Sequence, residues 1–180
     1  MKILLILLIA LTTQSFAQSL PPIHAMDLGT GETKNHQWKD AKKGSVVVFL
    51  SSLCPCSNAH INHLVELANE FPDIKFIGIH SNTNESPNDS KEYFKSKNLP
   101  FPVFQDDSTE WADRLKAYRT PHAYLINPEG ILAYQGGVTS SADPDQADSF
   151  YLKVTLKKFI AGEKIESSRT RVLGCQIARK

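Results

Sequence analysis

Short apolar runs separated by an amphipathic stretch predict alternating strands and helices. Residues 46–50 and 74–79 are nearly all apolar and rich in β-branched side chains, as is typical of strands buried on both faces. Between them, from 58 to 70, apolar residues recur at spacings of three and four, which predicts an amphipathic helix. Strand, helix and strand in this order form a right-handed crossover between two parallel strands.

The rest of the chain continues the alternation and ends in a polar tail. The predicted elements are, in order, a surface loop over 80–90, a helix over 91–97, a strand over 101–104, a helix from a capping box of Asp107 and Glu110 through Tyr118, a hairpin of strands 123–126 and 131–134, and a helix from about 148 to 161. This order predicts an α/β, thioredoxin-like fold with a central mixed β-sheet flanked by helices.

The first residues have the pattern of a secretory signal peptide. Lys2 precedes an apolar run over 3–11, and small residues lead to Ala17, after which we expect cleavage. A membrane-spanning helix needs roughly 20 apolar residues, so we expect no stable membrane anchor. We therefore predict a signal peptide over 1–17, one domain over 18–180, and a secreted or periplasmic location.

Charge and cysteine content narrow the function. The formal net charge of +1 falls to zero once residues 1–17, with one lysine and no acid, are removed, so we expect no nucleic-acid partner. Three cysteines are an odd number for an exported chain. At least one thiol is therefore free, intermolecular or reactive.

Cys54 lies where a buried strand passes into a helix, and Pro55 follows it. Unpaired backbone N–H groups and the helix dipole favour a thiolate there, and the thiolate is the nucleophile. The dipole supplies at most about 2 kcal/mol, so we expect a second hydrogen-bond donor to the sulfur. The hydroxyl of Ser51, three residues earlier, is our first candidate. Further candidates are Ser52, Ser57 and His60.

Two groups of residues resemble a known family. The first contains Ser51, Cys54, Pro55, Ser57, Asn58, Thr120 and Pro121, and the second is the ending Gly174, Cys175, Gln176, Ile177 and Arg179. In this order and spacing they are similar to the redoxin superfamily, and within it to a peroxiredoxin-like branch of the alkyl hydroperoxide reductase and thiol-specific antioxidant (AhpC/TSA) group. The resemblance runs from about residue 23 to 179.

The resemblance implies a thiol oxidoreductase that needs no cofactor. In such an enzyme Pro121 is a cis-proline that faces Cys54, and Cys54 attacks a protein or small-molecule disulfide or a hydroperoxide. Cys175 is then the natural partner of Cys54, with Cys56 as the other candidate resolving thiol, and an external reductant completes the cycle.

Three positions depart from related proteins. Ser57 stands where thioredoxins have their second cysteine, so a Cys-x-x-Cys exchange is not available. Leu53 stands where extracytoplasmic thioredoxins usually have tryptophan. Val47 stands where peroxidases have a proline four residues before Ser51. Ser51 itself matches the hydroxyl that precedes a peroxidatic cysteine, and only Arg119 is a candidate for the guanidinium that polarises peroxide.

Three other interpretations stay open. Cys56 and Cys175 could form a structural disulfide, with Cys54 an inert buried thiol. The chain could be a redox-inert binding module on the same scaffold. It could also be a copper metallochaperone that uses Cys54, Cys56 and His122, since copper proteins of the Sco group combine two cysteines with a later histidine.

Overall fold

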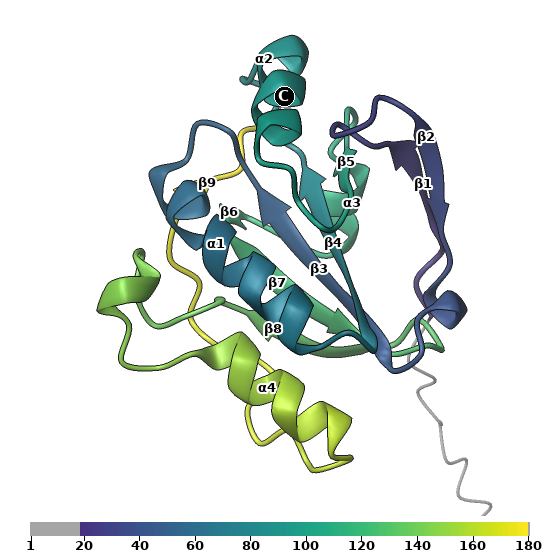
Figure 1. Cartoon of the computed structure of the whole chain (residues 1–180), viewed down its shortest axis with the longest axis vertical. Helices are drawn as coiled ribbons and strands as arrows, with labels where there is room; N and C mark the ends of the chain where they lie inside the picture. Colours follow the sequence, from purple (N-terminus) through teal and green to yellow (C-terminus); the bar gives the residue numbers. More distant parts are fainter. Residues whose placement is uncertain (1–18, 180) are drawn as a thin grey trace, which may run out of the picture.

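A five-stranded mixed sheet forms the centre of the protein (Figure 1). The computed structural model describes residues 19–179, so the predicted signal peptide lies outside the described residues. The strands occur in the order β5-β4-β3-β7-β8, with bounds Val103–Gln105, Ile74–His80, Gly44–Leu50, His122–Ile126 and Leu132–Gly136. β3 pairs in parallel with β4 and antiparallel with β7. The predicted mixed sheet is therefore confirmed.

The central strand β3 is buried on both faces, as its unbroken apolar run predicts. Val46, Val48 and Leu50 belong to one hydrophobic cluster, whereas Val47 and Phe49 belong to the other. This division follows from the alternation of side chains along a strand. β3 can therefore carry the residues that follow it to a fixed position at the edge of the sheet.

Helices cover both faces of the sheet (Figure 1). The helices are α1 (Pro55–Glu70), α2 (Pro87–Ser96), α3 (Glu110–Arg114) and α4 (Tyr151–Ile160). The first cluster receives Leu64 and Leu67 from α1 and Leu156 from α4. The second receives Trp111 from α3 and Trp38 from a 3-10 helix, η1 (Trp38–Asp40).

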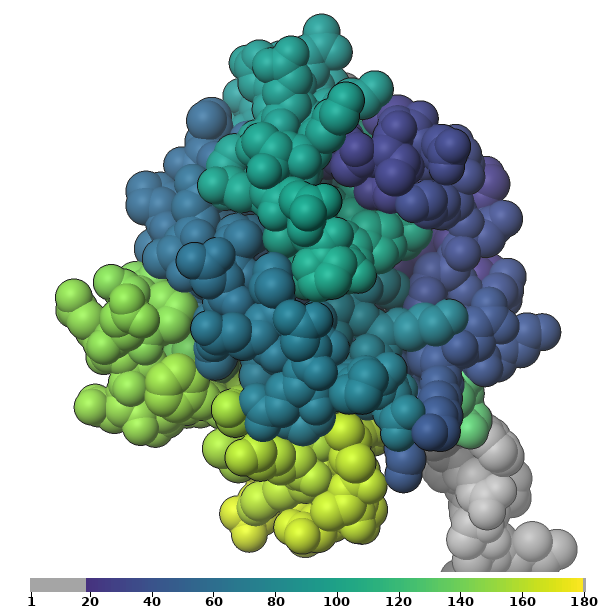
Figure 2. All heavy atoms as spheres, viewed as in Figure 1, coloured from purple at the N-terminus to yellow at the C-terminus, as the bar shows by residue number. Residues whose placement is uncertain are grey.

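Two small sheets complete the fold. β1 (Ile23–Met26) and β2 (Thr33–His36) form an antiparallel hairpin. β6 (Arg119–Thr120) pairs antiparallel with β9 (Cys175–Gln176), which brings the C-terminal tail beside the segment before β7. A second 3-10 helix, η2 (Pro144–Gln146), lies beside the start of α1 (Figures 1 and 2).

The predicted loop over 80–90 is wrong in two respects. α2 begins at Pro87 and not at residue 91, because the Ser86 side chain caps it by accepting from the Asp89 N–H. The segment is also not a surface loop, since His80 belongs to β4 and Glu85 is buried. The polar composition of residues 80–90 therefore led to the prediction of a surface loop where the chain forms a buried turn.

The boundaries of two other helices also differ from the prediction. Asp107 forms no capping box: the Asp106 carboxylate instead accepts from the N–H groups of Trp111 and Ala112. α3 ends at Arg114, and Lys116 has a φ of 54°, so the helix does not reach Tyr118. α4 begins at Tyr151, three residues later than predicted.

Candidate active site: three cysteines at the start of α1

Three cysteines from distant parts of the chain meet at one point. The Sγ atoms of Cys54, Cys56 and Cys175 all lie within 4.8 Å of one another. Cys54 is buried, with 2% of its surface exposed, whereas Cys56 is half-buried and Cys175 is exposed. All three are free thiols. The structure thus brings together the three cysteines predicted to react.

Cys54 is held at the N-terminus of α1, as predicted. It is the N-cap residue of the helix, Pro55 occupies the first turn, and the Ser57 N–H donates to Cys54 Sγ at 3.4 Å. This bond satisfies one of the N–H groups left free at a helix start. Cys56 lies in the same first turn, so its thiol stays beside that of Cys54.

The C-terminal tail places Cys175 against β6. Cys175 is the register partner of Thr120 in the β6–β9 pair. After it, Ile177 is buried in the second cluster and donates its N–H to the Tyr118 carbonyl at 3.1 Å. The Arg179 guanidinium pairs with Asp113 at 2.8 Å. Contacts beyond the cysteine therefore fix the tail, and Cys175 stays beside Cys54 with no rearrangement.

The peptide bond between Thr120 and Pro121 is cis, as the resemblance implied. The Thr120 carbonyl accepts a hydrogen bond from the Cys54 thiol at 3.1 Å. The Thr120–Pro121 segment therefore lies between the tail and the helix start, and Thr120 contacts both sides of the site.

The surroundings of Cys54 favour its thiolate. Burial alone would raise the pKa of the Cys54 thiol. Hydrogen bonds from Cys175, Thr120 and the Ser57 backbone outweigh burial and lower that pKa below its ordinary value. The pKa of Cys56 is raised by burial and by the charge of Cys54. The pKa of Cys175 is raised in the same way, so Cys54 is the most acidic thiol of the three.

The prediction that the Ser51 hydroxyl donates to the Cys54 sulfur is wrong. The Ser51 hydroxyl donates to Glu85 Oε1 at 2.5 Å and accepts from the Cys54 N–H at 3.0 Å, so its hydrogen is not available to the sulfur. Ser52 also donates to Glu85. Among the further candidates, only Ser57 contacts the sulfur, and it does so through its backbone.

The hydroxyl donor that the sequence analysis missed is Thr120. Its side chain is fully buried, and its Oγ1 has no hydrogen-bond partner within residues 19–179 while Cys54 is protonated. The Cys54 thiolate can accept a hydrogen bond from this hydroxyl. This bond stabilises the thiolate and so lowers the pKa of Cys54. Thr120 lies 66 residues from Cys54, so spacing alone could not reveal it.

Replacing Thr120 with valine tests this contact. The substitution keeps the shape and removes only the hydroxyl, and a hydrogen bond to a charged group contributes about 1.5–3 kcal/mol. We expect a higher Cys54 pKa and a loss of roughly tenfold in thiolate at pH 7. The absorbance of the thiolate as a function of pH measures this change, with Thr155→Val, which removes a buried hydroxyl from α4, as control. An unaltered titration would contradict the role of Thr120.

A buried carboxylate supports the turn that carries Cys54. Glu85 Oε2 accepts from the Ser52 N–H at 2.8 Å and lies 3.1 Å from His80 Nε2, while Oε1 accepts from Ser51. Burial alone would raise the pKa of Glu85, but the bonds from His80, Ser51 and Ser52 lower it to about 2. Glu85 was missed because its serine partners lie 33 and 34 residues earlier.

Two further predicted residues have other roles. Arg119 donates to the Gly174 carbonyl, so its guanidinium holds the tail and is a poor substitute for a peroxide-polarising group. His122 is buried and its Nδ1 lies 2.9 Å from the Tyr124 hydroxyl; burial lowers the pKa of His122 to about 4. Within residues 19–179, the side chain that lies close enough to Cys54 and Cys56 to share a metal ion with them is Cys175, and not His122.

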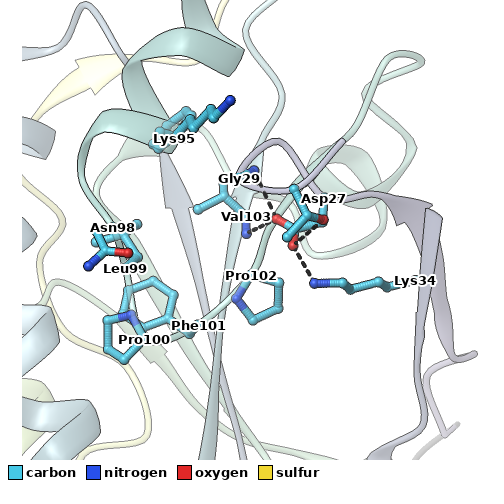
Figure 3. A pocket seen from close by; sticks show the side chains of 12 residues that line it. Asp27, Gly29, Lys34, Lys95, Asn98, Leu99, Pro100, Phe101, Pro102 and Val103 are labelled. Carbon is cyan, nitrogen blue, oxygen red and sulfur yellow. Dashed lines mark hydrogen bonds and ion pairs between the residues drawn. The ribbon is translucent and has the colours of Figure 1, made fainter. Parts of the chain in front are cut away.

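A separate cavity of about 290 Å³ lies beside α2 and the segment before β5 (Figure 3). Its Asp27 carboxylate accepts from the N–H groups of Gly29 and Val103 and pairs with Lys34 at 2.7 Å. None of the three cysteines lines this cavity. The carboxylate joins the β1–β2 connection to β5, and the thiol chemistry lies elsewhere.

A cysteine at the start of the helix after the central strand, opposite a cis-proline, defines a protein of the thioredoxin-like class. A family model described as the AhpC/TSA family matches residues 17–135. The chain therefore belongs to the AhpC/TSA family, as the resemblance implied. No curated protein matches the chain.

Solved structures show the same fold. A conserved protein from Geobacillus kaustophilus is 23% identical, with 94% of each chain covered and a TM-score of 0.78. A secreted disulfide oxidoreductase from Mycobacterium tuberculosis, homologous to DsbE of E. coli, is 21% identical over 75% of this chain and 94% of its own, with a TM-score of 0.56. Peroxidoxin BcpB from the same organism is 13% identical over 81% and 96%, with a TM-score of 0.60.

Proposed function

We propose that the protein is an exported thiol–disulfide oxidoreductase in which Cys54 is the nucleophile and Cys175 the resolving thiol. The observation that carries this proposal is the convergence of the three sulfur atoms within 4.8 Å at the start of α1. The lowered pKa of Cys54 supports its role, because the thiolate attacks and the thiol does not. A fixed Cys175 substitutes for the second cysteine of a Cys-x-x-Cys motif.

The proposed cycle transfers two electrons from the protein to a disulfide. The Cys54 thiolate attacks one sulfur of the substrate, forms a mixed disulfide and releases the first substrate thiolate. Cys175 then gives up its proton and attacks Cys54 Sγ, which forms a Cys54–Cys175 disulfide and releases the second half of the substrate as a thiol that takes up this proton. An external dithiol reduces this bond and restores both thiols.

The contacts of Ser51 and Arg119 favour a disulfide over a hydroperoxide as substrate. Cleavage of a peroxide needs donors that stabilise the leaving oxygen as charge develops on it. The Ser51 hydroxyl donates to Glu85, and Arg119 donates to the tail. Attack on a disulfide needs no such donors, because a substrate thiolate is a good leaving group.

Export is part of the proposal. The signal-peptide pattern of residues 1–17 supports it, and an extracytoplasmic compartment is where disulfides form and persist. Within the part of the chain that the structure describes, no helix has the length and apolar character to cross a membrane.

Oxidation of the reduced protein tests the proposed function. We expect one equivalent of oxidised glutathione to convert the wild type to an intramolecular disulfide, whereas Cys175→Ser stops at a glutathione adduct on Cys54. Cys54→Ser should react roughly 100-fold more slowly, because only less acidic thiols remain. Acid quenching, alkylation and mass spectrometry measure these products, and hydrogen peroxide forms a parallel arm. A wild type inert to both oxidants would identify a redox-inert module instead.

The same three sulfur atoms favour one second candidate function, the binding of a soft cation such as Cu(I). Thiolates are preferred ligands for Cu(I), and three of them can surround one ion. This site differs from the predicted copper site, since Cys175 replaces His122. Competition of the reduced protein with a chromophoric Cu(I) chelator, in the wild type and Cys175→Ser, tests it. Equal retention of copper by both would contradict a three-sulfur site.

A further inference from the structure

We infer that the oxidised site passes its disulfide outward, from the Cys54–Cys175 pair, one sulfur of which is buried, to the more exposed Cys56–Cys175 pair. This inference rests on the proposed function and assigns ordered roles to both candidate resolving thiols. Cys54 reacts with the substrate, Cys175 resolves it, and Cys56 then releases Cys54. The geometry behind this order is a gradient of exposure across three sulfur atoms that all lie within 4.8 Å of one another.

The exchange step balances without any further oxidant. The Cys56 thiol loses its proton to water, and its thiolate attacks Cys175 Sγ. The bond between Cys54 and Cys175 breaks, a bond between Cys56 and Cys175 forms, and Cys54 leaves as the thiolate. The protein holds one disulfide before and after, so the step is an isomerisation that releases one proton.

The surroundings of the three thiols give this step its direction. The more acidic thiol of a disulfide is the better leaving group, and the backbone of Ser57 and the Thr120 hydroxyl stabilise Cys54 as a thiolate. Cys56 differs, because burial disfavours its charged form. Exchange therefore frees Cys54 as a stabilised thiolate and leaves the disulfide between Cys56 and Cys175, the two less acidic thiols.

Burial shows what the step achieves. Only 2% of Cys54 is exposed, so a large reductant can reach the Cys54–Cys175 bond through the sulfur of Cys175 alone. Cys175 is exposed on β9, and Cys56 is half-buried in the first turn of α1. A disulfide between these two lies at the surface, where the dithiol of a folded protein can attack it. The partner chemistry that fits the re-reduction step is therefore a protein dithiol.

Mapping of the disulfide with time tests the relay. We expect wild type treated with one equivalent of oxidised glutathione to show Cys54–Cys175 first and Cys56–Cys175 at the end, with Cys54 alkylated after quenching. Cys54 and Cys56 share one tryptic peptide, so fragment ions from either side of Pro55 identify the alkylated cysteine. Because Cys56 must ionise, the second phase should accelerate as the pH rises from 7 to 9.

A matched variant separates the possible failures. In Cys56→Ser we expect the bond to stay at Cys54–Cys175, whereas the wild type should lose at least about nine-tenths of that pairing by the end of the second phase. A wild type that retains Cys54–Cys175 at equilibrium would overturn the relay and leave the proposed function intact. A wild type in which Cys54 never enters a disulfide would overturn both.

Discussion

Replacement of Glu85 with alanine is expected to lower the free energy of unfolding by about 3–5 kcal/mol at pH 7, because several buried hydrogen-bond donors lose their charged acceptor at once. The change leaves His80 buried without its carboxylate partner, and Ser51 and Ser52 lose the acceptor for their hydroxyls. The turn before Cys54 should loosen at the same time. Urea unfolding followed by circular dichroism measures the first effect.

The pH dependence of this loss identifies the carboxylate as its cause. The pKa of Glu85 is about 2 in the folded protein and near 4.5 in the unfolded chain, so its contribution is fully present above pH 4.5 and is lost as the pH falls toward 2. The difference between wild type and variant should therefore shrink over that range. Glu92→Ala, which removes an exposed carboxylate from α2, serves as control. An equal loss in both variants would contradict this role of Glu85.

Replacement of Gly174 with alanine is expected to disconnect Cys175 from Cys54. Gly174 has a φ of 139°, which side chains rarely adopt, and a methyl group there would collide with the Thr120 carbonyl oxygen and lie 2.8 Å from its carbon. The β6–β9 pair must then separate. We expect formation of the Cys54–Cys175 disulfide by oxidised glutathione to slow at least about 100-fold, and the glutathione adduct on Cys54 to accumulate instead. The reason is that the effective concentration of the Cys175 thiol at Cys54 depends on how the tail places it.

Gly162→Ala provides the matched control for this effect. Gly162 also has a positive φ, 71°, but an added methyl there meets nothing within 4 Å. Its replacement should cost about 1 kcal/mol of stability through backbone strain alone and should leave the disulfide rate unaltered. If the two variants form the disulfide equally fast, the close approach of Gly174 to β6 does not position Cys175.

Local patterns predicted the parts of the fold that depend on local physics. The apolar run of β3 and the three- and four-residue spacing in α1 placed Cys54 at the junction of strand and helix. The hairpin of β7 and β8 followed from its turn residues. The family resemblance supplied the cis bond before Pro121, which spacing alone would not favour.

The parts that the sequence did not reveal depend on contacts across the fold. Ser51 was a reasonable donor by spacing, but a buried carboxylate 34 residues later takes its hydrogen. Thr120 reaches Cys54 only because β6 lies beside the start of α1. His122 follows the cis-proline at the right position for a ligand, yet its ring bonds Tyr124. In each case the residue type indicated what chemistry the side chain can perform, but the sequence did not reveal which partner it contacts.

The distance along the chain between the paired cysteines links redox state to folding. Cys175 lies 121 positions after Cys54 and 119 after Cys56, so either disulfide closes a loop that contains most of the domain. A loop of this length removes enough entropy from the unfolded chain to stabilise the fold by about 4–5 kcal/mol. The two loops differ by only about 0.01 kcal/mol, so chain entropy neither drives nor opposes exchange between them. The oxidised protein is thus the more stable one throughout its cycle, and the local surroundings of the three thiols, rather than chain entropy, decide which sulfur atoms hold the bond.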